Sequence, residues 1–216
     1  VQIRMPRMSN EEMQQLILTR YNRCGLRTDH DTTWKIGFLS RGLPPYTHLL
    51  AMNAALYAIA SKRIGVTHED VDGSLARSVS DVTQSIREQY STAIRTQKKD
   101  TLYPYVLLAC ALAKTDEMGR FQQTDVVQPL NQILPGKAYT AATFALHMNE
   151  FTEISRGEVL KRTGTPRNYR YRFADPMMQP FVVFKGLAEG ILSDKSAEIF
   201  SAKPQSELFS NEPLRQ

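Results

Sequence analysis

The spacing of hydrophobic residues changes at Gly157, and this change limits the folds open to the chain. Before Gly157, apolar residues recur every three or four positions, as on one face of an α-helix. After it, aromatic residues alternate with arginines from Tyr169 to Phe173, and alternation is the period of a β-strand. A Gly-Thr-Pro-Arg turn precedes this alternation. The sequence therefore predicts one β-hairpin in a mainly α protein, with strands at 158–163 and 168–173, aromatics on one face and cations on the other.

Helix-capping and helix-breaking residues mark the ends of the helical segments. Ser9 with Glu12, and Thr67 with Asp70, have the spacing of capping boxes. The segment that begins at Thr67 predicts one continuous helix to about residue 97. The segment that begins at Pro44 has a broad apolar face, so we expect that helix to be largely buried. In order, the predicted helices cover residues 9–25, 31–39, 44–65, 67–97, 103–113, 124–134, 140–154 and 179–192.

The polar segment Lys98-Lys99-Asp100 divides these elements into two groups. We expect a helical domain over residues 1–97 and a second domain over 101–192, each with its own core, followed by a tail over 193–216 with little periodicity. In the second domain three helices precede the hairpin, and the short break at 135–137 joins two of them tightly. This order of elements is typical of a winged-helix module, a helix-turn-helix with a hairpin wing.

Two further segments carry a family resemblance. LSRGLPPYTHLL, residues 39–50, follows MPRMSNEEM and resembles the lid region of AAA+ ATPases related to origin-recognition initiators and to transposition ATPases. The part from YPYVLLACALA to YRYRFADPMMQPFV resembles the winged helix that follows such lids. The resemblance covers most of residues 1–192. It implies a helical AAA+ lid bundle, and a parent protein whose separate N-terminal domain binds ATP and magnesium.

The same resemblance implies a nucleotide-sensing residue in the lid. In the family an arginine of the lid helix reaches the nucleotide phosphates, and its usual place is occupied here by Pro45. The nearby candidates are Arg41 and His48, of which Arg41 is favoured because a permanently charged guanidinium suits phosphate. The alternative is that Arg41 closes the preceding helix, where a cation is favourable in any case.

The sequence contains none of the short motifs that carry catalysis. Its one Gly-Lys pair, Gly136-Lys137, is followed by Ala138 and has Asn131 at the position of the first loop glycine, so it is no phosphate-binding loop. We therefore expect that this chain is not an enzyme by itself and holds no cofactor. The cysteines and histidines have no metal-ligand spacing, and we expect no metal.

No apolar run in the sequence approaches the roughly 18 residues that span a bilayer. We therefore expect no membrane partner and a cytoplasmic location.

The net charge of +5 is concentrated in one segment. Six basic residues and one acid lie between Arg156 and Arg172, and the remaining 199 residues sum to zero. A focused basic excess on a hairpin wing predicts contacts with the phosphates of duplex DNA. The expected contact residues are Lys161, Arg162, Arg167, Arg170 and Arg172.

The helix before the hairpin, expected at 140–154, has no lysine or arginine. Its apolar residues Phe144, Met148, Phe151 and Ile154 should face the core. Asn149 is then the candidate for contact with base edges. We expect binding that is led by the wing and depends mainly on charge and DNA shape.

Two alternatives stay open. The winged helix can instead be a protein-interaction module of an AAA+ assembly, including a homo-oligomer, or the chain can be a free-standing transcription regulator.

The missing motifs generate a first prediction. The isolated chain should neither bind ATP tightly nor hydrolyse it, because the lid supplies at most one phosphate contact and the sequence has no phosphate-binding loop and no set of magnesium ligands. Phosphate release from ATP by the purified chain is the measurement. Turnover that disappears in the Arg41→Ala variant would contradict the prediction.

Overall fold

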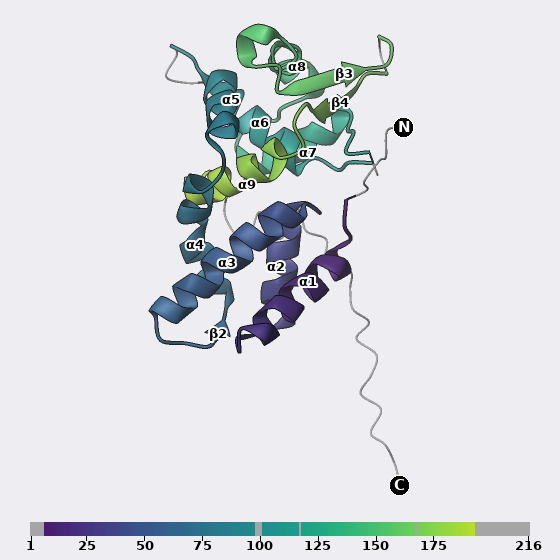
Figure 1. Ribbon diagram of the computed structural model, residues 1–216. Coiled ribbons are helices and arrows are strands. Elements are labelled where there is room, and N and C mark those ends of the chain that lie inside the picture. The colour runs from purple at the N-terminus through teal and green to yellow at the C-terminus, as the bar shows by residue number, and fades with distance from the viewer. Residues whose placement is uncertain (1–6, 98–100, 117, 167, 193–216) are drawn as a thin grey trace.

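The computed structural model describes residues 7–97, 101–116, 118–166 and 168–192 and shows a mainly helical protein (Figure 1). The helices of the N-terminal half are α1 (Asn10–Arg23), α2 (His30–Ser40), α3 (Pro44–Ala60), α4 (His68–Ser80) and α5 (Gln84–Ile94). The C-terminal half contains α6 (Tyr103–Leu112), the 3-10 turn η1 (Gln123–Val126), α7 (Val127–Ile133), α8 (Ala141–Glu150), the 3-10 turn η2 (Ile154–Arg156) and α9 (Met178–Ala188). Within these ranges no helix is both long and apolar enough to cross a membrane.

The predicted helix starts agree with the structure where a cap fixes them. The backbone N–H of Glu12 donates to Ser9 Oγ at 3.2 Å, and the Ser9 N–H donates to the Glu12 carboxylate at 2.7 Å. Pro44 occupies the first turn of α3, where its missing N–H costs no helical bond. These local contacts satisfy N–H groups that the helix itself leaves unpaired.

The continuous helix predicted from Thr67 to residue 97 is wrong. α4 ends at Ser80 and α5 begins at Gln84, with Thr83 in an extended conformation between them. Val82 is buried in this break, and Asp81 accepts a hydrogen bond of 3.1 Å from the Asn53 side chain of α3. The hydrophobic period runs through both helices because each buries one apolar stripe, so periodicity alone does not reveal the turn between them.

The hairpin is shorter than predicted. β3 (Leu160–Thr163) and β4 (Arg170–Phe173) pair in antiparallel register, with Leu160 opposite Phe173 and Thr163 opposite Arg170. Phe121 extends this pairing, because its backbone exchanges hydrogen bonds of 2.9 and 2.8 Å with Tyr171. The hairpin is therefore anchored to the segment that follows α6.

Helix α9 packs against both halves of the chain and lies between them in Figure 1. On one side Phe184 meets the ring of Tyr46 edge to face, with centroids 5.4 Å apart, and Phe181 meets Tyr90 at the same distance. On the other side the buried Gln179 amide donates to the Ala111 carbonyl of α6 at 2.9 Å. The buried hydrophobic residues consequently form one connected cluster, and the expected pair of separate cores is not found.

The boundary expected at 98–100 and the tail expected at 193–216 lie outside the described residues. The positions of the domain boundaries therefore stay a prediction, although the cores of the two halves are joined.

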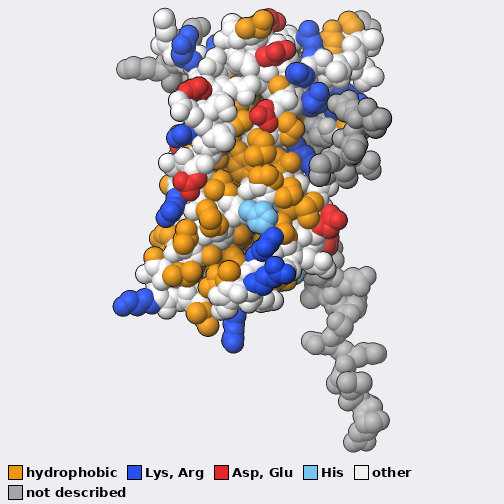
Figure 2. Space-filling model, in the orientation of Figure 1, with side chains coloured by type: hydrophobic (Ala, Val, Ile, Leu, Met, Phe, Trp, Pro, Cys, Tyr) orange, Lys and Arg blue, Asp and Glu red, His pale blue; other side chains and the backbone are white. Residues whose placement is uncertain are grey.

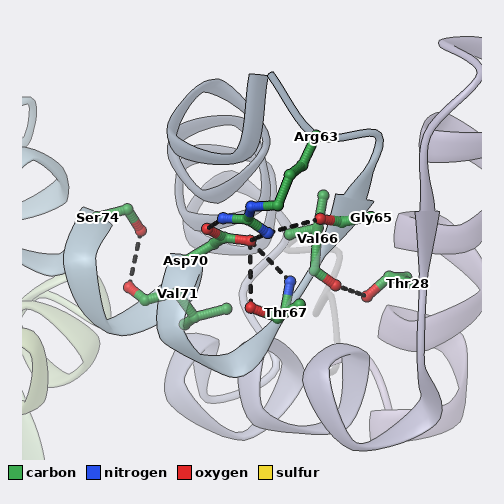
Figure 3. A network of polar contacts seen from close by, with 8 residues as sticks. All are labelled: Thr28, Arg63, Gly65, Val66, Thr67, Asp70, Val71 and Ser74. Atoms are coloured by element: carbon green, nitrogen blue, oxygen red, sulfur yellow. Dashed lines mark hydrogen bonds and ion pairs between the residues drawn. The ribbon is translucent and has the colours of Figure 1, made fainter. Parts of the chain in front are cut away.

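A polar network closes the far end of the N-terminal half (Figure 3). The strands β1 (Arg27–Thr28) and β2 (Gly65–Val66) form a short parallel pair there. Arg63 donates to both carboxylate oxygens of Asp70 and to the Gly65 carbonyl, and the Thr67 N–H donates to Asp70 at 2.9 Å. Burial raises the pKa of Asp70, but the bonds and charge of Arg63 and the Thr67 N–H outweigh burial, so this pKa lies below its usual value.

The shared core generates a prediction about cooperativity. Tyr46→Phe removes a 2.7 Å hydrogen bond from the Tyr46 hydroxyl to the Met177 carbonyl and should lower the free energy of unfolding by about 1 kcal/mol. The single tryptophan, Trp34, lies in α2, so its fluorescence reports the N-terminal half and circular dichroism reports all helices. The two signals should change together in wild type and variant, and Tyr57→Phe, at a 48% exposed site, is the control. A separate transition for Trp34 would contradict one shared core.

The Asp70 network generates a prediction with a defined sign. The folded pKa of Asp70 is depressed, so its contribution to stability is present above the unfolded value of about 4 and is lost as pH falls through the folded pKa. Asp70→Asn should therefore cost about 2 kcal/mol near neutral pH, with a difference from wild type that shrinks in acid. Urea unfolding at several pH values measures this difference, with Glu153→Gln, at an exposed site outside this network, as the control. A difference that does not change with pH would contradict the assignment.

Candidate nucleic-acid interface

The β3–β4 hairpin presents cations on its outer face. Lys161 and Arg172 lie directly opposite each other across the two strands, and both are exposed. Arg170 shares this face, since residues two apart along a strand point the same way. On the inner face Leu160, Tyr171 and Phe173 are buried. The predicted separation of aromatics from cations therefore holds along β4.

Arg162 is the exception, because the register places it opposite Tyr171, on the inner face. Its guanidinium lies over the ring of Tyr169, 4.5 Å from the centroid, and donates a 2.9 Å hydrogen bond to Asn149 Oδ1 on α8. The structure thus joins two of the residues that the sequence singled out. The side-chain carbonyl oxygen of Asn149 therefore orients the guanidinium of Arg162. No spacing in the sequence predicts this contact.

The turn between the strands requires a glycine. Gly164 has φ +98°, and a Cβ at this position would come within 2.5 Å of the Asn168 carbonyl oxygen. Arg167, expected to contact DNA, lies outside the described residues.

The outer cations have no internal counter-charge in the part of the hairpin that the structure describes. No carboxylate of a described residue forms an ion pair with Lys161, Arg170 or Arg172. Two like charges directly opposite on a hairpin are destabilising. Figure 2 shows basic side chains grouped at the end of the molecule that holds this hairpin. The arrangement favours an external anion.

Arg156, counted in the same basic segment, is used inside the protein. Its guanidinium lies 3.7 Å from the centroid of the Tyr103 ring and forms an ion pair of 3.3 Å with Glu150. Tyr103 also donates to Glu150. The segment therefore combines a structural cation near η2 with the outward cations of the hairpin, and Glu150 is neutralised locally.

The exposed face of α8 differs from the expected one. Phe144, Met148 and Phe151 are buried as predicted, but Ile154 is 88% exposed because the helix ends at Glu150 and η2 begins a new turn. Leu146 is 65% exposed. His147 packs on Tyr103, with ring centroids 4.6 Å apart, and burial lowers its pKa.

Arg41 lies in the turn between α2 and α3, and His48 lies near the start of α3. Arg41 ends α2 in a left-handed conformation with φ 53°, and its guanidinium lies over Phe38 and donates to the Ala113 carbonyl at 3.4 Å. His48 is exposed on α3. No hydrogen bond joins these two described side chains.

The surface of α3 around His48 is more apolar than expected. Met52, Leu56 and Ile59 recur at helical spacing and are 51%, 39% and 53% exposed. Hydrophobic side chains cover much of the face shown in Figure 2, over the N-terminal half. The expectation that this helix is largely buried is therefore wrong for one of its faces. A broad apolar pattern in the sequence does not distinguish a helix face in the core from an exposed apolar face that binds a partner.

Among the described residues no three His, Cys, Asp or Glu side chains form a group that could hold a metal ion. No protein-family model, curated protein or solved structure matches this chain.

Proposed function

We propose that this chain is the C-terminal portion of an AAA+ ATPase, in which the helical half acts as a lid and the C-terminal half acts as a winged helix that binds duplex DNA. The observation that carries the DNA proposal is the opposed pair Lys161 and Arg172, exposed and without a described carboxylate partner. Phosphates neutralise such cations and release counterions, which is the main source of affinity for DNA.

The hairpin geometry supports contacts with the DNA backbone. Lys161, Arg170 and Arg172 share one face, while Leu160 and Phe173 hold the other face against the helices. A rigid inner face keeps the cations in a fixed pattern, and phosphate contacts fix the register of a protein on a duplex without reading its sequence.

Asn149 has a different role in this proposal from the one expected. Its carbonyl oxygen is engaged by Arg162, which leaves the amide N–H₂ of Asn149 as a donor. We infer that Asn149 positions Arg162 at the junction of α8 and the hairpin, where both side chains can meet DNA.

The lid proposal rests on the resemblance, and two features support it. The turn after α2 places Arg41 and Gly42 at positive φ before Pro44 opens α3. The exposed apolar stripe of α3 beside His48 offers a surface for the nucleotide-binding domain of the parent protein. In this proposal His48 faces that domain, ATP and magnesium are bound there, and Arg41 senses phosphate only if a ligand enters the space beside Ala113.

One observation favours a second function. Leu146 on α8 and Ile154 in η2 are exposed apolar residues, and α8 contains no lysine or arginine. This surface suits a protein partner of an AAA+ assembly, with the hairpin cations meeting acidic residues.

The DNA proposal predicts the behaviour of a hairpin variant. Changing Lys161, Arg170 and Arg172 together to Gln should weaken binding to two unrelated duplexes alike. It should also make the slope of log affinity against log salt shallower by about 0.9 per lost contact, because fewer counterions are released. Fluorescence anisotropy at several salt concentrations measures both quantities.

A matched control removes three exposed cations elsewhere, by changing Arg20, Arg23 and Arg87 to Gln. If long-range charge alone governs binding, control and hairpin variants will lose the same affinity. If the hairpin variant binds DNA like wild type at low salt, the DNA proposal fails and the protein-interaction function takes its place.

A further inference from the structure

A cleft of about 790 Å³ lies between the two halves of the molecule. Its walls come from the segment before α1, the end of α2, the end of α6 with the following loop, and the start of α7. The polar residues among those that line it are Arg7, Asn10, Arg41, Lys114, Thr115, Thr124, Asp125 and Gln128.

Two guanidiniums meet in this cleft. Arg7 Nη1 donates to the Arg41 carbonyl at 2.8 Å, and Arg41 Nη2 donates to the Ala113 carbonyl at 3.4 Å. Burial lowers the pKa of Arg41 to about 10, and the nearby charge of Arg7 acts in the same direction. Both groups remain protonated near neutral pH. The cleft therefore holds two like charges that are partly withdrawn from water.

No described carboxylate pairs directly with the charges of Arg7 and Arg41. Asp125 lines the cleft, but its carboxylate accepts the Gln122 N–H at 2.7 Å and caps η1. Desolvated charge without a partner is costly, and carbonyl acceptors offset only part of that cost.

The backbone holds this arrangement in place. The Met8 N–H donates to the Gly42 carbonyl at 3.1 Å, which lays the segment of Arg7 along the turn after α2. A Cβ at Gly42 would come within 2.8 Å of Arg7 Cβ, so only glycine allows this close approach. Each guanidinium has five N–H donors, and most of them are left without a described protein acceptor.

We propose that this cleft binds a small phosphate-bearing ligand, held by the forked guanidiniums of Arg7 and Arg41, with Lys114 at the exposed rim. A doubly charged phosphate matches two or three cations better than a single carboxylate does, and a guanidinium binds it through paired hydrogen bonds. The proposal does not depend on DNA binding by the hairpin. It shares Arg41 with the lid proposal but requires no separate nucleotide-binding domain. Since both halves line the cleft, the bound ligand tightens the contact between α2 and α6.

The test uses the full chain and inorganic phosphate. Calorimetric titration at constant ionic strength should show saturable binding, and thermal unfolding should shift upward with phosphate. Arg7→Gln and Arg41→Gln should each weaken binding by about tenfold or more. Lys114→Gln should have a smaller effect because the lysine is exposed. Arg41→Lys keeps the positive charge but removes the planar guanidinium. This variant replaces Arg41→Gln in the test if Arg41→Gln does not fold.

Three controls distinguish binding in the cleft from binding to surface cations. Lys161→Gln with Arg172→Gln on the hairpin, and Arg20→Gln on α1, should leave phosphate binding unchanged. Ribose 5-phosphate should bind at least as well as phosphate, and ribose should not bind. Tighter binding of the sugar phosphate identifies a phosphate monoester as the ligand, and equal binding identifies phosphate itself.

Two results would overturn the proposal. The first is a titration in which the wild-type protein shows no saturable binding of phosphate. The other is binding that survives in Arg7→Gln and in Arg41→Lys but disappears in the hairpin variant.

Discussion

The packing of α9 between the two halves is the interaction on which the rest of the structure depends. Phe181 and Phe184 place aromatic rings against Tyr90 and Tyr46 of the N-terminal half, and Gln179 bonds α6 of the other half. Aromatic pairs of this kind add stability beyond the area that they bury. Since β4 leads through a short turn into α9, the same helix that unites the core also fixes one end of the hairpin.

Both proposed anion sites follow from this arrangement. The buried inner face of the hairpin and the pairing of Phe121 with Tyr171 hold the two strands in place. The cations of the outer face therefore point away from the protein interior. The cleft lies where segments of the two halves face each other beside Arg41 and Ala113. In each place the fold holds cations together without an ion pair to a described carboxylate. The proposed anions would offset the energetic cost of this arrangement.

The sequence predicted most helices, the hairpin and the segregation of aromatics from cations along β4, because these depend on local caps and local periodicity. It could not predict the break at Val82, the shared core or the exposed face of α3, since these depend on which elements meet in space. The candidate site was predicted only in part. Alternation placed Arg172 correctly, but nothing local indicated that Arg162 would bond Asn149 or that Arg7 would meet Arg41.

We propose that the outer face of the hairpin is the surface that meets duplex DNA. Nuclear magnetic resonance of the isotope-labelled chain, titrated with a short duplex, tests it most directly because each backbone amide reports its own surroundings. We expect the largest shifts at residues 160–163 and 170–173 and at the Asn149 side-chain amide, with little change around His48 and Met52. Shifts confined to α3, or no shifts at saturating DNA, would contradict it.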